Sequence, residues 1–263
     1  MTIAGSDPSG GAGLQADLKT FAALKVYGLS VITAVIAQNS ACVSRVQAVE
    51  PEMVTAQLAT IVAERMPDGL KIGALASAAV TKIVAQSVES LGLPAPVVDP
   101  VLVASSGARL LEPAGERILR DQLIPLARVV TPNIPEAEAL SGIEIGSIGA
   151  MRQAARALHK LGARAVLIKG GHWPAALGDG HRAAKAVDLL FDGRRFIEFA
   201  ATRIRGEGAH GTGCALSAAI AAWLARGADL ETAIGRAKRF MTRALKNPLM
   251  LGSGRYVLDH FAR

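Results

Sequence analysis

The stretch Ala209-His210-Gly211-Thr212-Gly213-Cys214, residues 209–214, leads directly into the apolar segment 215–220. Glycine permits backbone conformations with positive φ and lets a ligand approach the main chain closely. The helix predicted to follow has unpaired N–H groups in its first turn and a partial positive charge there. We therefore expect residues 211–214 to bind phosphate oxygens.

Cys214 falls in the first turn of this predicted helix, where the field of the helix is expected to lower the pKa of the thiol. The alternative interpretation is a glycine turn before a core helix, with Cys214 as a small buried residue. A short Gly-x-Gly motif does not by itself separate the two interpretations. The rest of the chain favours the phosphate site.

The composition excludes several classes of protein. The 29 basic and 22 acidic residues give a net charge of +7, but the basic residues are scattered and only 4% of residues are aromatic. We therefore expect attraction for small anions and no nucleic-acid binding. Cys42 and Cys214 form no Cys-x-x-Cys motif, which argues against a zinc ribbon or disulfide framework and favours the cytoplasm. The longest nearly apolar run, 214–225, is too short to cross a membrane.

The N-terminal part of the chain combines a glycine-dense loop with a strand-like run. The loop, residues 6–13, follows a short strand and opens a helix. The run 30–37 is rich in β-branched residues and predicts a strand that ends on Gln38. Ligands of open α/β sheets bind beyond the carboxyl ends of strands, so Gln38 is a candidate ligand-binding residue. The segment 40–49 is expected to form a short hairpin or lid.

Helical and strand-like segments alternate from residue 51 onward, as they do in proteins with a parallel sheet. The expected helices span 52–64, 77–91, 113–123, 147–161, 212–226 and 229–246, and the expected strands span 70–72, 97–98, 127–130, 165–168, 186–191 and 195–199. Residues 173–185 form a predicted glycine-containing flap. Without a linker or an internal repeat, we expect one α/β domain over residues 1–263.

The expected strand ends supply Asp99, Asn133, Glu136 and Lys169, and residues 211–214 complete the set. Phosphoryl transfer requires groups of three kinds. Carboxylates and amides can bind Mg²⁺ or its waters, and a lysine can pair with phosphate charge. Backbone N–H groups can stabilise the negative charge that develops during transfer. Each residue has an alternative role. Asp99 could cap a helix, Asn133 and Glu136 could form an N-terminal cap, and Lys169 could lie on the surface.

Two common nucleotide-binding motifs are absent. The chain contains no Gly-x-x-x-x-Gly-Lys-Ser/Thr motif, so it is not a P-loop enzyme. The first loop contains Gly11-Ala12-Gly13, but the third glycine of the dinucleotide motif does not follow. Hydride transfer is therefore disfavoured.

The chain resembles the ribokinase-like superfamily and, within it, the hydroxymethylpyrimidine and phosphomethylpyrimidine kinases of thiamine synthesis. The matching stretches cover almost the whole chain in order: residues 2–19, Ala37-Gln38-Asn39, Lys71-Ile72-Gly73, Asp99-Pro100-Val101, residues 131–137, Lys169-Gly170-Gly171-His172 and residues 210–214. The resemblance implies a three-layer α/β sandwich, with a mostly parallel central sheet, helices on both faces and a small β flap.

The resemblance also implies an aminopyrimidine substrate. Gln38 would hold the aminopyrimidine through its amide, with Asp17 and Gly5 lining the same pocket. Ala74 and Val101 are further expected pocket residues. A methionine common in this pocket is Ala74 here, which leaves the size of the acceptor open.

ATP and Mg²⁺ are the implied cofactor and metal. The resemblance implies that Asp99, Asn133 and Glu136 bind the metal and phosphates, and that Lys169 and Thr212 bind the nucleotide phosphates. Gly211, Thr212, Gly213 and Cys214 would surround the transferring phosphoryl group. The segments 104–107 and 251–255 depart from the family pattern, because they lack a lysine and a Gly-Pro-Val sequence found in relatives.

Most sugar kinases of the superfamily carry aspartate, the general base, at the position of Cys214. The family reaction has two steps, and its second acceptor is a phosphate that is already anionic. Two like charges at ~4 Å repel by about 4 kcal/mol at an effective dielectric constant of ~20. We therefore hypothesise that the thiol of Cys214 allows the anionic second acceptor to bind.

Two other functions are considered. Pyridoxal kinases of this type share the glycine loop and the cysteine, but Gln38 favours an aminopyrimidine, whose amino group and ring nitrogen can both pair with a carboxamide. A non-catalytic pyrimidine-binding sensor would be expected to lack some of Lys169, Glu136 and residues 211–214, and all are present. Relatives are often dimers, so a homodimer is expected.

Overall fold

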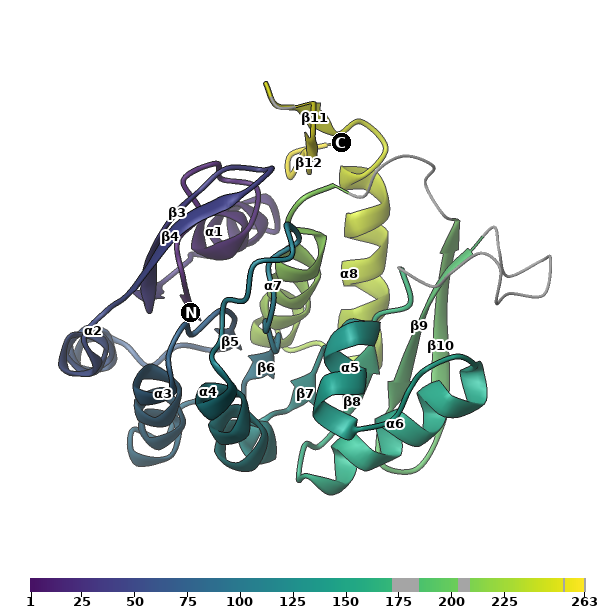
Figure 1. The fold of residues 1–263 in the computed structure, drawn as a ribbon, viewed down its shortest axis with the longest axis horizontal. Coiled ribbons are helices and arrows are strands. Elements are labelled where there is room, and N and C mark those ends of the chain that lie inside the picture. Colours follow the sequence, from purple (N-terminus) through teal and green to yellow (C-terminus); the bar gives the residue numbers. More distant parts are fainter. Residues whose placement is uncertain (172–184, 203–208, 253, 263) are drawn as a thin grey trace.

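The computed structural model describes residues 1–171, 185–202, 209–252 and 254–262. Its centre is an eight-stranded sheet in the order β10-β9-β8-β7-β6-β5-β1-β2 (Figure 1). The strands of this sheet are β1 (Thr2–Ala4), β2 (Ser30–Ile32), β5 (Lys71–Ile72), β6 (Val97–Val98), β7 (Val129–Val130), β8 (Val166–Ile168), β9 (Lys185–Phe191) and β10 (Phe196–Thr202).

Most of this sheet is parallel, as predicted. Strands β1, β2 and β5 to β8 pair in parallel, whereas β9 is antiparallel to both β8 and β10 at one edge. Residues 192–195, which begin with Asp192-Gly193, connect β9 and β10, in agreement with the two strands expected over 186–191 and 195–199. Because the parallel strands end at one edge, the loops after β1, β6, β7 and β8 can form a common site.

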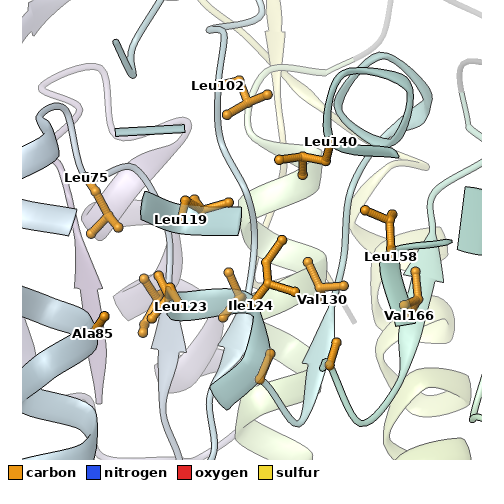
Figure 2. Close-up of a cluster of buried hydrophobic side chains, with 14 of the residues drawn as sticks. Leu75, Ala85, Leu102, Leu119, Leu123, Ile124, Val130, Leu140, Leu158 and Val166 are labelled. Atoms are coloured by element: carbon orange, nitrogen blue, oxygen red, sulfur yellow. The ribbon is translucent and has the colours of Figure 1, made fainter. Parts of the chain in front are cut away.

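Helices cover both faces of the sheet and give the predicted three layers (Figure 1). One layer contains α1 (Gly13–Ala23), α7 (Thr212–Ala225) and α8 (Leu230–Ala244), and the other contains α2 (Pro51–Glu64), α3 (Ala78–Ser90), α4 (Pro113–Ile118), α5 (Ile134–Ser141) and α6 (Ile148–Lys160). Neighbouring strand residues divide between the two cores. Val98 and Val130 pack in one core with α3 and α6, of which Figure 2 shows the part around Val130, whereas Val97 and Val129 pack against α7 and α8.

The predicted single strand over residues 30–37 is wrong, because the chain leaves the main sheet at Thr33. The Thr33 hydroxyl donates to the Ala74 carbonyl at 2.6 Å, and its N–H donates to Ala4. Beyond this point β3 (Ala34–Gln38) pairs with β4 (Val43–Ala48) as a separate antiparallel hairpin. We call this hairpin the flap. The hairpin or lid expected over residues 40–49 is only partly right, because this segment supplies the turn and β4, whereas the first strand is β3, which carries Gln38 away from the edge of the main sheet.

Other boundaries differ in detail. Helix α4 ends at Ile118 and continues as a π-helical turn over Leu119–Leu123. The small hairpin of β11 (Leu249–Met250) and β12 (Tyr256–Val257) was not expected. The glycine-containing segment expected over 173–185, which is not the flap of β3 and β4, lies outside the described residues, except for Lys185, which begins β9. None of the helices in the described ranges is long and apolar enough to span a membrane.

Candidate active site

Helix α7 begins without a side-chain cap from any residue that the structure describes. Its N-cap is Gly211, with φ of 83°, whereas α3, α6 and α8 begin with side-chain caps from Ser77, Ser147 and Asp229. A Cβ atom at Gly211 would lie 1.8 Å from the carbonyl oxygen of Gly11, so only glycine fits. The first turn of α7 therefore has N–H groups without a side-chain cap among the described residues, and phosphate binding by residues 211–214 stays a prediction.

The glycine-dense loop before α1 is folded around the carboxylate of Asp7. Its Oδ1 accepts hydrogen bonds from the N–H and hydroxyl of Ser9, and its Oδ2 accepts one from the Ala12 N–H at 2.7 Å. Burial would raise the pKa of Asp7, but hydrogen bonds from His210, Ser9 and Ala12 lower it to about 2. The loop is thus held by a permanent anion, and it contacts the N-terminus of α7 through Gly11.

Lys169 connects the ends of β6, β7 and β8. Its Nζ lies 2.7 Å from Asp99 Oδ1 and 4.0 Å from Glu136 Oε2. The Ser217 hydroxyl on α7 donates to Asp99 Oδ2 at 3.3 Å. A Cβ at Gly213 would lie 3.1 Å from the Lys169 ammonium. The structure therefore brings Asp99, Glu136 and Lys169 together beside the first turn of α7.

Asn133 and Glu136 form a capping box at the start of α5, which was the alternative role considered for them. The Asn133 side chain accepts from the Glu136 N–H, and the Glu136 carboxylate accepts from the Asn133 N–H, both at 2.8 Å. Glu136 nevertheless faces Lys169. The pKa of Glu136 is raised to about 7, because burial, together with the nearby charge of Asp99, outweighs the opposing charge of Lys169. Asp99 caps no helix; it pairs with Lys169.

The expected lowering of the Cys214 pKa is wrong. Burial raises the pKa of the Cys214 thiol to about 11, although Lys71 and a hydrogen bond from the Gly13 N–H act in the opposite direction. Cys214 is partly buried, and the loss of hydration disfavours its charged form more than these two groups favour it. At neutral pH the thiol is therefore protonated.

Asp17 does not line an open pocket, contrary to expectation. Its carboxylate is completely buried and lies 2.7 Å from the equally buried Lys71 ammonium. The Thr2 hydroxyl donates to the same oxygen at 2.6 Å. Although burial favours a neutral lysine, Asp17 holds the pKa of Lys71 above its usual range. The Lys71 ammonium lies close enough to Cys214 to influence the pKa of the thiol.

The remaining acceptor-site residues lie around the flap. The Gly5 N–H donates to the Ala74 carbonyl at 3.0 Å, and a Cβ at Gly5 would lie 3.0 Å from Ile36 of β3. Val101 packs against the flap core of Ala34, Ile36 and Leu110. Gln38 is partly exposed at the end of β3, and its contact with a pyrimidine stays a prediction.

Several residues of the site were not assigned a role from sequence. Lys71 is the clearest case, and its signal was a lysine between the apolar residues Leu70 and Ile72 in a buried strand. Ser217 and Asp7 gave weaker signals, since serine in an apolar helix and aspartate in a glycine loop are common.

Comparisons with known proteins agree with this geometry. A family model described as phosphomethylpyrimidine kinase matches residues 7–259. The hydroxymethylpyrimidine/phosphomethylpyrimidine kinase of Bacillus subtilis is 42% identical over 262 residues, which cover 100% of this chain and 94% of the relative. The thiamine biosynthesis bifunctional protein of Geobacter sulfurreducens is 46% identical over 260 residues; these are 99% of this chain but only about half, 51%, of that protein.

A solved structure shows the same fold. The ADP complex of Bacillus subtilis pyridoxal kinase matches with a TM-score of 0.88 at 38% identity, over 99% of this chain and 96% of that chain. The ribokinase-like architecture expected from the sequence is thus confirmed. With the family model matching nearly its full length, the chain belongs to the phosphomethylpyrimidine kinase family.

Proposed function

We propose that the protein transfers the γ-phosphoryl group of ATP to 4-amino-5-hydroxymethyl-2-methylpyrimidine and then to the resulting monophosphate, in thiamine synthesis. The observation that carries this proposal is the uncapped first turn of α7, with Lys169 and its two carboxylate partners beside it. Such a site stabilises transferring phosphoryl groups through positioning and charge.

The phosphoryl group would be held by the backbone N–H groups of residues 212–214 and by the Lys169 ammonium. Lys169 is bound to Asp99 on one side and approached by Glu136 on the other. These two carboxylates raise the pKa of Lys169, although burial alone would lower it. The lysine therefore remains charged where the negative charge of the transition state develops.

The residues fit a Mg²⁺ ion that is bound together with the nucleotide. Asp99 and Glu136 supply carboxylate oxygens, the ligands that Mg²⁺ prefers, beside the site proposed for the phosphates. No group of three or more His, Cys, Asp or Glu side chains within the described segments forms a complete metal site. This agrees with Mg²⁺, which usually takes one or two carboxylates and completes its shell with water and phosphate. When bound, the ion would neutralise phosphate charge.

The acceptor would bind between the flap and the glycine loop. Gln38 offers one amide donor and one acceptor, which suits the adjacent amino group and ring nitrogen of an aminopyrimidine. Ala74 and Val101 provide apolar surface for the ring. Cys214, protonated at neutral pH, adds no negative charge near an acceptor that is already a phosphate.

Pyridoxal phosphorylation is the second candidate activity. It is favoured by the structural similarity to the Bacillus pyridoxal kinase, a protein of 38% identity. Gln38 is less suited to pyridoxal, which lacks the amino group beside the ring nitrogen. A non-catalytic pyrimidine sensor is not favoured, because Lys169, Glu136 and residues 211–214 are all present.

Mass spectrometry of the products tests the proposal. The protein is mixed with ATP, Mg²⁺ and either the hydroxymethylpyrimidine or pyridoxal. We expect the pyrimidine monophosphate to appear first and the diphosphate next, with pyridoxal phosphate formed more slowly. Formation of pyridoxal phosphate alone, or of no phosphorylated product, would contradict the proposal.

A further inference from the structure

His210, immediately before the N-cap of α7, connects three loops. Its Nε2 lies 2.9 Å from Asp7 Oδ2 in the glycine loop, and its Nδ1 lies 2.8 Å from Ser105 Oγ. Its backbone N–H donates to the Tyr256 carbonyl at 2.8 Å. Ser105 is exposed, His210 is 9% exposed and Asp7 is completely buried, so the three side chains run from the surface to the interior.

The direction of these hydrogen bonds follows from the charge of Asp7. An ionised carboxylate only accepts hydrogen bonds, so Nε2 of His210 must carry the proton that points to Asp7. Nδ1 then faces Ser105, whose hydroxyl can donate to a neutral ring or accept from a charged ring. Asp7 thus orients the His210 ring so that Nδ1 meets Ser105.

The loop that carries Ser105 also contacts the flap. Residues 103–109, which we call the Ser105 loop, form a tight turn in which the Ala104 N–H donates to the Ala108 carbonyl at 2.8 Å. Leu110, directly after this loop, forms one apolar cluster with Ala34 and Ile36 of β3, and Ala104 inside the loop packs against this cluster. The Ser105 loop therefore touches the flap on one side and His210 on the other.

We propose that His210 is a positioning residue that, through Ser105, holds the Ser105 loop and the flap against the N-terminus of α7. The phosphate site and the flap residue Gln38 lie on different elements, and the described contacts of His210 join their supporting loops. Loss of the Ser105 hydroxyl releases the loop without altering the residues assigned to phosphate binding. This inference rests on the proposed function where it concerns turnover.

The expected effect falls on acceptor binding. One neutral hydrogen bond corresponds to about a 2- to 10-fold change in an equilibrium constant. In Ser105→Ala we expect the KM for the pyrimidine to rise by about that factor, while the KM for ATP and kcat change less than two-fold. Ser105→Thr retains the hydroxyl and is expected to restore the KM.

The neighbouring Ser106 provides a matched control. It is also exposed, and its side chain makes no hydrogen bond within the part of the chain that the structure describes. Ser106→Ala should behave as the unmodified protein. Equal KM values in Ser105→Ala and Ser106→Ala, or no recovery in Ser105→Thr, would overturn the proposal.

Two measurements do not depend on turnover. Nitrogen-15 NMR of labelled histidine should show His210 with a proton on Nε2. Hydrogen exchange of the flap amides, residues 34–48, should be faster in Ser105→Ala than in Ser106→Ala. A protonated Nδ1 with a bare Nε2, or equal exchange in both variants, would overturn the positioning role. Absence of kinase products with the expected NMR and exchange results would instead contradict the proposed function alone.

Discussion

The ammonium of Lys71 lies 2.7 Å from the carboxylate of Asp17, and both side chains are completely buried. Removing one member of such a pair leaves an uncompensated charge in the interior, which typically costs 3–5 kcal/mol. We therefore expect Asp17→Asn and Lys71→Met each to lower the free energy of unfolding by about this amount. In the double variant the loss should be smaller than the sum, as urea denaturation would measure. Simple additivity would show that the two charges do not stabilise each other.

Gly211→Ala should weaken ATP binding more than the strain of an alanine at positive φ would by itself. Gly211 and Gly227 have nearly equal φ angles, 83° and 82°, so alanine is strained at both by roughly 1–2 kcal/mol. At Gly227 the added methyl group meets no atom within 4 Å, whereas at Gly211 it meets the Gly11 carbonyl. Gly227→Ala is therefore the control. We expect only Gly211→Ala to weaken ATP binding, by about ten-fold or more in calorimetry; equal affinities would contradict the close contact.

Glu136 gives the protein a distinctive pH dependence. Its pKa in the folded state is about 7, against an ordinary value of 4.5, because the carboxyl group is buried. Between pH 4.5 and 7 the folded state binds more protons than the unfolded state, so stability falls as the pH rises through this window. We expect this contribution to be on the order of 1–3 kcal/mol.

Glu136→Gln tests this dependence, because glutamine can still accept the hydrogen bond of the capping box. The melting temperature of the variant should fall less than that of the unmodified protein between pH 4.5 and 7. Identical pH profiles would show that another group is responsible.

Cys214 is expected to matter most for the second phosphorylation. In Cys214→Asp a carboxylate would stand near the phosphate of the second acceptor, and like charges at ~4 Å repel by up to about 4 kcal/mol. The kcat/KM for the monophosphate should therefore fall at least ten-fold more than that for the alcohol. Cys214→Ser, which is neutral, should leave the ratio of the two values unchanged. Equal losses for both steps in Cys214→Asp would refute the hypothesis.

Much of the fold could be predicted because periodicity and strand composition are local properties. The helices near residues 78–90, 148–160 and 230–244 follow their apolar spacing, and the short buried strands follow their valines. The break at Thr33 could not be predicted, because β-branched residues continue on both sides of it. Only the hydrogen bonds of Thr33 to Ala4 and Ala74 show where the chain leaves the sheet.

The proximity of several residues of the candidate site could be predicted from the sequence, whereas the protonation of Cys214 and the burial of Asp17 could not. Strand ends and the glycine stretch placed Asp99, Lys169 and Gly213 together, since the topology of a parallel sheet brings these positions to one edge. The pKa of Cys214 depends on burial by segments distant in sequence, so the helix field alone gave the wrong direction. Asp17 was likewise expected to line the substrate pocket, because its contact with Lys71 joins positions that are distant in sequence.

The central claim is that the first turn of α7 binds the transferring phosphoryl group while Gln38 holds the acceptor. A crystal structure with the hydroxymethylpyrimidine, Mg²⁺ and a non-hydrolysable ATP analogue tests it most directly. We predict terminal phosphate oxygens within hydrogen-bonding distance of the N–H groups of residues 212–214, and the Gln38 amide paired with the pyrimidine. Phosphates bound elsewhere, or a pyrimidine remote from Gln38, would contradict the account.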